Sequence, residues 1–177
     1  MWVGGLSHDI HPDFVRKTKD FVQYFRPKID ELNNLLSYNK IFVERTANIG
    51  ILPADVAINY GATGPILRAS GVKWDLRKND PYSIYDRFDF DIPVGEGLKG
   101  TVGDCWDRYY VRVLEMVESL KIIEQAIDNI PEGDVQEAVP KRVKPPKGSI
   151  YARFENPKGE LGYFIISDGS VNPFRVK

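Results

Sequence analysis

The sequence predicts an α+β protein, mainly α, in which a bundle of long helices carries a small antiparallel β element. Two long segments place apolar side chains at helical spacing, and the C-terminal segment changes to the two-residue period of strands. A Pro- and Lys-rich stretch between them is typical of an extended linker. We therefore divide the chain into a helical part at 1–133, a linker at 134–148 and a small β element at 149–177.

The composition excludes several classes of protein. The chain has 177 residues, of which 42% are hydrophobic and 28% charged, so a disordered chain is excluded. No run approaches the roughly 20 apolar residues that a membrane-spanning helix needs. The net charge of −1 gives no reason to expect a nucleic-acid partner. The first residues lack a basic region followed by an apolar core, so we predict no signal peptide.

The few cysteines and histidines argue against a metal centre. Cys105 is the only cysteine, which excludes an internal disulfide and a cysteine cage within this sequence. We expect it to be a small buried hydrophobic residue rather than a nucleophile. His8 and His11 lie close together but have no third ligand nearby, so we expect no zinc site.

The first helix is predicted to begin at Pro12, because proline favours the first turn of a helix. Pro27 lies inside its apolar pattern and should kink the helix or split it in two, since proline donates no backbone hydrogen bond. A second, short helix is expected at about 53–60, with Gly61 as its stop.

The longest helix is predicted at about 104–130, where apolar residues recur every three or four positions. The Gly-rich loop at 94–104 before it should be flexible. Two strands are predicted at 149–154 and 161–167, joined by a turn at 156–159, with a third strand near Phe174.

The segment 64–95 mixes charged and aromatic residues without a clean period. One interpretation is a buried lattice of ion pairs that fixes an irregular backbone. Another is an interface, because arginine and aromatic residues are enriched at binding hot spots. A third is an ordinary solvated loop, in which the aromatic side chains would be wasted. The candidate interface residues here are Arg68, Trp74, Asp75, Arg77 and Tyr85.

The start of the longest helix continues this mixture. Asp104, Arg108 and Arg112, followed by Glu115, lie at helical spacing on one face. Aromatic residues surround the same turns, so we expect buried or interface ion pairs rather than solvated ones. The first three residues complete the candidate interface set.

Asp9 follows the glycine pair at Gly4 and Gly5. It is either a turn residue with local hydrogen bonds or a carboxylate paired with a partner elsewhere, such as a histidine in a proton-transfer site. The residue pattern alone leaves both interpretations open.

Several motifs in order resemble a known family. They are GGLSHDIHPDF, TGPILRASGVKWDLRKNDPYSIYD, FDFDIPVG, GDCWDRYYVRVLEMVESLKIIEQAI and GELGYFIISDGSVNPFRVK. Together they resemble the D subunit of proton-pumping NADH:quinone oxidoreductase, respiratory complex I, which is related to the large subunit of nickel–iron hydrogenases. The resemblance covers nearly the whole chain and implies a helical bundle of the hydrogenase large-subunit type.

The resemblance also implies a function. In that family this subunit forms the quinone cavity with the subunit that carries the terminal iron–sulfur cluster, and quinone reduction drives proton translocation. The chain itself would bind no cofactor, with quinone as the substrate of the complex. Its partners would be that iron–sulfur subunit and other peripheral quinone-module subunits, at the cytoplasmic face of the inner (plasma) membrane.

One functional residue carries over by this resemblance. Asp9, in GGLSHD, matches a family aspartate that hydrogen-bonds a quinone-site histidine. The resemblance implies that this histidine lies in an N-terminal region outside this sequence. The family's C-terminal segment also lies outside it, so we expect the fragment alone to be inactive. Alternatives are the large subunit of a membrane-bound nickel–iron hydrogenase and a non-catalytic scaffold of the same fold.

Overall fold

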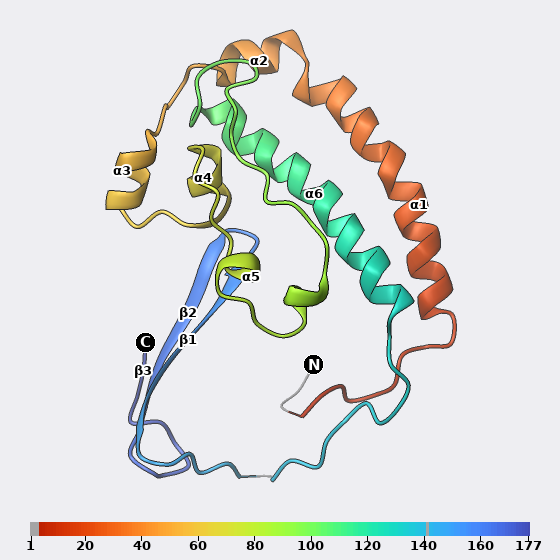
Figure 1. The fold of residues 1–177 in the computed structure, drawn as a ribbon, viewed down its shortest axis with the longest axis vertical. Coiled ribbons are helices and arrows are strands. Elements are labelled where there is room, and N and C mark those ends of the chain that lie inside the picture. Colours follow the sequence, from red (N-terminus) through yellow and green to blue (C-terminus); the bar gives the residue numbers. More distant parts are fainter. Residues whose placement is uncertain (1–3, 141) are drawn as a thin grey trace.

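The computed structural model describes residues 4–140 and 142–177 (Figure 1). Its two long helices, α1 (Phe14–Leu32) and α6 (Cys105–Asp128), lie side by side, and a β-hairpin extends from the opposite side of α6 (Figure 1). The shorter helices are η1 (Asn33–Ser37), α2 (Lys40–Thr46), α3 (Ala54–Asn59), α4 (Gly64–Ala69), α5 (Leu76–Asn79) and η2 (Tyr85–Arg87). The strands are β1 (Gly148–Asn156), β2 (Gly159–Ser167) and β3 (Arg175–Val176). The predicted α+β class is confirmed.

The main apolar core lies in the seam between α1 and α6. Val22 and Ile29 of α1 pack there with Val113 and Leu120 of α6, and each of the four side chains is at most 4% exposed. Ion pairs follow the same seam, since Arg26 contacts Glu124 at 2.8 Å. The apolar spacing of both helices is therefore the pattern that buries them against each other.

Helix α1 runs unbroken through Pro27, so of the two predicted effects of this proline, a kink or a split, the split is wrong. Pro27 and Gln23, the residue whose carbonyl loses its helical partner, are both exposed. Water can hydrogen-bond a carbonyl that faces solvent, which lowers the cost of proline at this position. The apolar seam on the opposite face then holds the helix together.

The end of α1 is fixed by α6. Trp106 is fully buried, and its indole Nε1 donates to the Ser37 carbonyl at 3.0 Å. The Ser37 hydroxyl lies 2.9 Å from the Tyr109 hydroxyl. Because Ser37 closes the π-helical turn η1, these contacts satisfy polar groups that the wide turn leaves near the core.

The segment 64–95 contains three short helices that its sequence pattern did not predict, α4, α5 and η2. After η2 it runs along α6 as an extended strap. The Gln125 side chain accepts from the Asp89 amide at 2.8 Å and donates to the Asp89 carbonyl at 2.7 Å. Glu118 accepts from the Asp91 amide at 2.8 Å. Side chains of α6 thus form the hydrogen bonds with this extended backbone that a neighbouring strand would otherwise form.

The Gly-rich loop packs against α4 and the start of α6, and its predicted flexibility stays a prediction. Gly95 is buried, and a Cβ at this position would meet the Ala69 carbonyl oxygen. The Asp107 carboxylate accepts from the Gly97 amide at 3.0 Å and from the Gly103 amide at 3.4 Å. Burial raises the pKa of Asp107, while these amide hydrogen bonds oppose the shift. The glycines permit this close approach of backbone to helix.

The other predicted elements are confirmed with small changes of boundary. The longest helix begins at Cys105 with Asp104 as its N-cap, and the short helix α3 ends before Gly61, whose φ is +68°. The sheet has the antiparallel order β1–β2–β3, and β1 pairs with β2 from Gly148↔Ser167 to Asn156↔Gly159. The turn is therefore where the sequence predicts it.

The turn of the hairpin rests on the N-terminus of α4. The Glu160 amide donates to the Thr63 hydroxyl at 2.9 Å, and Gly159 and Gly64 approach so closely that a Cβ on either would clash with the other segment. In the described residues, no helix is long and apolar enough to span a membrane.

Truncation of Leu120 tests the α1–α6 seam. Leu120 is 3% exposed, so we expect Leu120→Ala to lower the free energy of unfolding by about 2–5 kcal/mol through lost contacts and a cavity. Leu35, which is 76% exposed, serves as the control, and Leu35→Ala should cost less than about 0.5 kcal/mol. Urea denaturation of the 177-residue chain measures both, and equal losses would place the core elsewhere.

Candidate functional site

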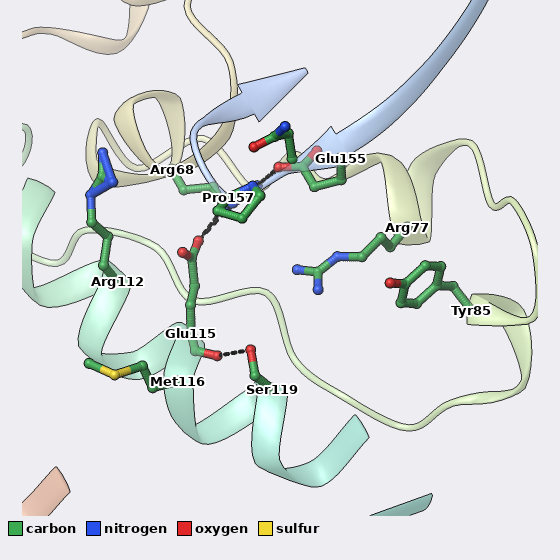
Figure 2. A pocket seen from close by; sticks show the side chains of 10 residues that line it. Arg68, Arg77, Tyr85, Arg112, Glu115, Met116, Ser119, Glu155 and Pro157 are labelled. Carbon is green, nitrogen blue, oxygen red and sulfur yellow. Dashed lines mark hydrogen bonds and ion pairs between the residues drawn. The ribbon is translucent and has the colours of Figure 1, made fainter. Parts of the chain in front are cut away.

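The largest gathering of predicted site residues surrounds Arg68, a fully buried arginine at 2% exposure (Figure 2). Its Nη2 lies 2.7 Å from Glu115 Oε1, and its Nη1 lies 2.8 Å from Glu155 Oε1 and 3.4 Å from Asp75 Oδ2. Nη1 also donates to the Trp74 carbonyl at 2.9 Å. One guanidinium therefore joins α4, the α4–α5 connection, α6 and β1. We call Arg68, Asp75, Arg77, Glu115 and Glu155 the Arg68 cluster.

Helix α5 is assembled by the same carboxylates. Asp75 is its N-cap and accepts from the Arg77 amide at 2.9 Å. Glu155 reaches across from β1 and accepts from the Leu76 amide at 3.2 Å. These bonds satisfy the free amides of the first turn, which a helix of four residues cannot satisfy itself.

Arg77 forms the second layer of the cluster. Its Nε and Nη2 donate to the two oxygens of Asp75 at 3.0 and 2.7 Å. Its guanidinium lies over the rings of Phe90, at 5.1 Å, and Tyr85, at 5.7 Å. Arginine thus links the carboxylates to the aromatic residues of the segment, which explains why the sequence interleaves the two kinds of residue.

Negative and positive side chains of the cluster are nearly equal in number. Three carboxylates, from Asp75, Glu115 and Glu155, face two guanidiniums. Burial raises the pKa of Glu115, and the charge of Arg68 and its hydrogen bond oppose that shift. Arg112, which is exposed on α6, supplies a further positive charge nearby without forming an ion pair among the described residues.

A cavity of about 400 Å³ opens beside the cluster. Arg68, Arg77, Tyr85 and Arg112 line it, together with Glu115, Met116, Ser119 and the start of the hairpin turn (Figure 2). In Figure 2 Arg77 and Tyr85 lie on one side of Glu115, and Arg112 lies on the other. The cavity walls thus carry both charge and apolar surface.

The structure brings together six of the predicted interface residues and separates two. Arg68, Trp74, Asp75, Arg77, Tyr85 and Arg112 lie in or beside the Arg68 cluster. The predicted buried ion-pair lattice is confirmed there. Whether this surface is an interface stays a prediction.

Asp104 and Arg108 serve the Gly-rich loop instead, so the predicted run of ion pairs along one face of α6 is wrong at this end. Asp104 is fully buried and accepts from the Asn48 amide at 2.8 Å and the Asp107 amide at 2.9 Å. Arg108 donates to the carbonyls of Gly103 and Gly50. Backbone groups compete for these side chains because the loop has few other partners.

Cys105 is half-buried rather than buried, and its Sγ accepts from Arg108 Nη2 at 3.0 Å. Among the described residues, no group of three or more His, Cys, Asp or Glu side chains is arranged to hold a metal ion. Glu155 is the member of the Arg68 cluster that the sequence does not predict, since it lies 87 residues from Arg68 and its own strand pattern gives no sign of burial.

Asp9 lies apart from the Arg68 cluster, in the loop before α1. It is exposed, and its Oδ1 accepts from the Ile10 amide at 2.7 Å, as the turn interpretation expects. It borders a hollow of about 690 Å³ whose apolar walls include Leu6, Ile10 and Ile127. The same lining also contains Glu132 and Asp134, so the Asp9 carboxylate stands at the edge of a hollow with both apolar and acidic walls.

The segment after α6 reaches this loop. The predicted linker at 134–148 pairs at its start with the N-terminal segment: Gly5 bridges Gln136, and the Leu6 amide donates to the Val135 carbonyl at 2.9 Å. Val135 also lines the hollow. The linker is thus partly ordered on the helical part of the chain.

Comparison with known proteins places the chain in a family. Residues 1–145 and 137–177 match the family described as the 49-kDa subunit of respiratory-chain NADH dehydrogenase. The chain belongs to this family. Because the two matches together span the sequence, both the helical part and the hairpin belong to it.

The relatives most useful for comparison are D subunits of NADH-quinone oxidoreductase. The D subunits of NADH-quinone oxidoreductase from Pelodictyon phaeoclathratiforme, Chlorobaculum tepidum and Chlorobium luteolum are 58%, 57% and 59% identical to this chain over 181 aligned positions. These alignments cover all of this chain but 45%, 45% and 46% of the relatives. The chain thus spans slightly less than half the length of the relatives it matches.

Removal of the Arg68 charge tests the cluster. Arg68→Met would leave three carboxylates without their shared partner, so we expect a loss of about 3–5 kcal/mol in the free energy of unfolding at neutral pH. Arg112→Met, the exposed control on α6, should change it by less than about 0.5 kcal/mol. Urea denaturation at several pH values provides the measurement.

The pH dependence of this loss has a definite sign. A carboxyl whose pKa is raised by folding stabilises the fold at low pH and loses that contribution as pH rises through the raised pKa. Arg68 lowers the pKa of Glu115, so its removal raises that pKa further. The difference between Arg68→Met and the unmodified chain should therefore shrink on acidification from pH 7 towards the ordinary carboxyl range, and a constant difference would contradict the ion-pair account.

Proposed function

We propose that the chain is part of the quinone-reducing module of an NADH:quinone oxidoreductase. The observation that carries this proposal is the match of both halves of the chain to the 49-kDa subunit family. The relatives named as D subunits of NADH-quinone oxidoreductase, which align over the whole chain, support the same assignment. They give no support to the hydrogenase alternative.

In this proposal Asp9 is the residue closest to the chemistry. Its carboxylate would accept a hydrogen bond from a histidine elsewhere in the full-length subunit, hold the imidazole in one tautomer and favour its protonated form. A histidine held this way can deliver a proton to a reduced quinone. The exposed carboxylate beside this hollow suits the role, since only its Oδ1 accepts a hydrogen bond among the described residues.

The Arg68 cluster has a different role in the proposal. Its side chains are saturated by one another, and they hold the cavity beside α6 in shape for a neighbouring subunit. The proposed neighbours are the subunit with the terminal iron–sulfur cluster and other peripheral subunits, at the cytoplasmic face of the membrane. Quinone would be the substrate of the assembled complex, with the cluster bound by the neighbour and no cofactor bound by this chain.

Asp9→Asn tests the catalytic part of the proposal. An amide of the same shape carries no charge, so it cannot stabilise a protonated histidine, and we expect quinone reduction by the complex to fall about tenfold or more. Quinone reductase activity is measured in membranes that carry the full-length subunit, with the amount of assembled complex as reference. Asp20→Asn, the same change at an exposed residue of α1, should leave the rate unchanged. Equal rates for both variants would remove Asp9 from the site.

Arg112→Glu tests the interface. Arg77→Glu would be ambiguous, because Arg77 is paired with Asp75 inside the cluster. Arg112 is exposed on the rim of the cavity, so its reversal should leave folding nearly unchanged and reduce co-purification of the full-length subunit with the complex several-fold. Arg45→Glu, an exposed arginine on α2, is the matched control. Full assembly of Arg112→Glu would show that this surface faces no partner.

A further inference from the structure

The loop that carries Asp9 is anchored at both ends by backbone contacts. At its start, the Glu137 amide donates to the Gly4 carbonyl at 2.8 Å and the Leu6 amide donates to the Val135 carbonyl at 2.9 Å. At its end, the Phe14 amide donates to the His11 carbonyl at 2.8 Å as α1 begins. Between these anchors, the Asp9 carboxylate bonds only the neighbouring Ile10 amide among the described residues.

The first anchor requires glycine. Gly4 and Gly5 have φ angles of +97° and +136°, which side-chain-bearing residues rarely adopt. A Cβ at Gly5 would clash with the Val135 carbonyl oxygen, and one at Gly4 would clash with a Val139 methyl group. A side chain at Gly5 must therefore push the N-terminal segment away from the segment after α6.

The two anchors lie at the same end of the helical seam, one next to each long helix (Figure 1). Val135–Glu137 follows the C-terminal end of α6, and His11 precedes the first turn of α1. The position of Asp9 therefore depends on both long helices. The hollow beside Asp9 is lined by the same parts, through Leu6 from the loop, Val15 from α1 and Ile127 from α6. Movement of the first anchor would shift Asp9 and reshape the hollow together.

We propose that the segment Val135–Glu137 is a positioning element for Asp9, and that it acts through its bridge to the Gly4–Gly5 backbone. The inference rests on the proposed function of Asp9 and adds to it a structural reason for the glycine pair. Val135, Gln136 and Glu137 touch no reacting atom in this account. They set where the Asp9 carboxylate stands relative to the histidine that it would bind.

The test uses Gly5→Ala in the full-length subunit within the assembled complex. A displacement of about 1 Å at a proton-transfer group can cost up to about 100-fold in rate, so we expect kcat/KM for quinone to fall about 10- to 100-fold. Gly61→Ala is the control, because Gly61 also has a positive φ, +68°, but an added Cβ there meets nothing within 4 Å. It should leave kcat/KM within about twofold, since only backbone strain is added.

A double variant separates positioning from general damage. If Gly5 acts through Asp9, then Gly5→Ala should cause little further loss in a subunit that already carries Asp9→Asn. Multiplicative losses in the double variant, or an unchanged rate in Gly5→Ala alone, would overturn the inference. An unchanged rate in Asp9→Asn alone would instead overturn the proposed function, so the two failures are distinguishable.

A second pair of variants covers the case in which Gly5→Ala prevents assembly. Glu137→Pro replaces the amide hydrogen that bonds Gly4 with a ring carbon, which breaks the bridge from the side of the segment after α6 and leaves the glycines unchanged. Glu137→Ala keeps that amide and removes only an exposed side chain. In a subunit that keeps Asp9, we expect Glu137→Pro to lower kcat/KM about tenfold and Glu137→Ala to leave it unchanged. In a subunit that carries Asp9→Asn, Glu137→Pro should have little further effect. Equal activity of the proline and alanine variants would count against the bridge.

Discussion

The buried guanidinium of Arg68 is the interaction on which the middle of this structure depends. It lies at 2% exposure and meets carboxylates from three separate parts of the chain, Asp75, Glu115 and Glu155. Burial of a charge is costly unless it is paired and hydrogen-bonded, so an arrangement in which Arg68 is displaced would strand several charges at once. This makes one backbone path through the region strongly favoured over others.

The short elements around Arg68 could not form alone. Helices α4 and α5 contain six and four residues, which is far below the length at which a helix is stable in water. Glu155 of β1 accepts from the first amide of α5, and Glu115 of α6 and Glu155 hold α4 through the Arg68 side chain. The turn end of the hairpin is held by Glu155, by the Thr63 hydroxyl and by the Gly64–Gly159 contact. The pair of Arg153 with Asp80 and the contact of Phe154 with the Tyr82 ring add to this attachment. The domain division at 149–177 therefore stays a prediction, because the cluster spans it.

The sequence predicted those parts whose signal is local. Apolar spacing identified α1 and α6, and the turn residues at Asn156–Gly159 identified the hairpin, because helix and strand periods appear within a few residues. It missed α2, α4, α5 and η2, and the partners that hold α4 and α5 lie up to 87 residues away. It placed Arg68, Asp75 and Arg77 in an ion-pair lattice by residue type, but it could not find Glu155. It also paired Asp104 with Arg108 by spacing, although backbone amides and carbonyls take both side chains.

Hydrogen exchange of the unmodified chain and of Arg68→Met tests the central claim most directly. The informative amides are Leu76, which donates to Glu155, Gly95, which donates to the Arg68 carbonyl, and Glu160, which donates to Thr63. If Arg68 joins these elements to α6, their protection should fall together in Arg68→Met while Val113 in the α1–α6 seam keeps its own. Protection that is lost at α4 alone, or unchanged at Glu160, would show that the hairpin and α5 are held independently of Arg68.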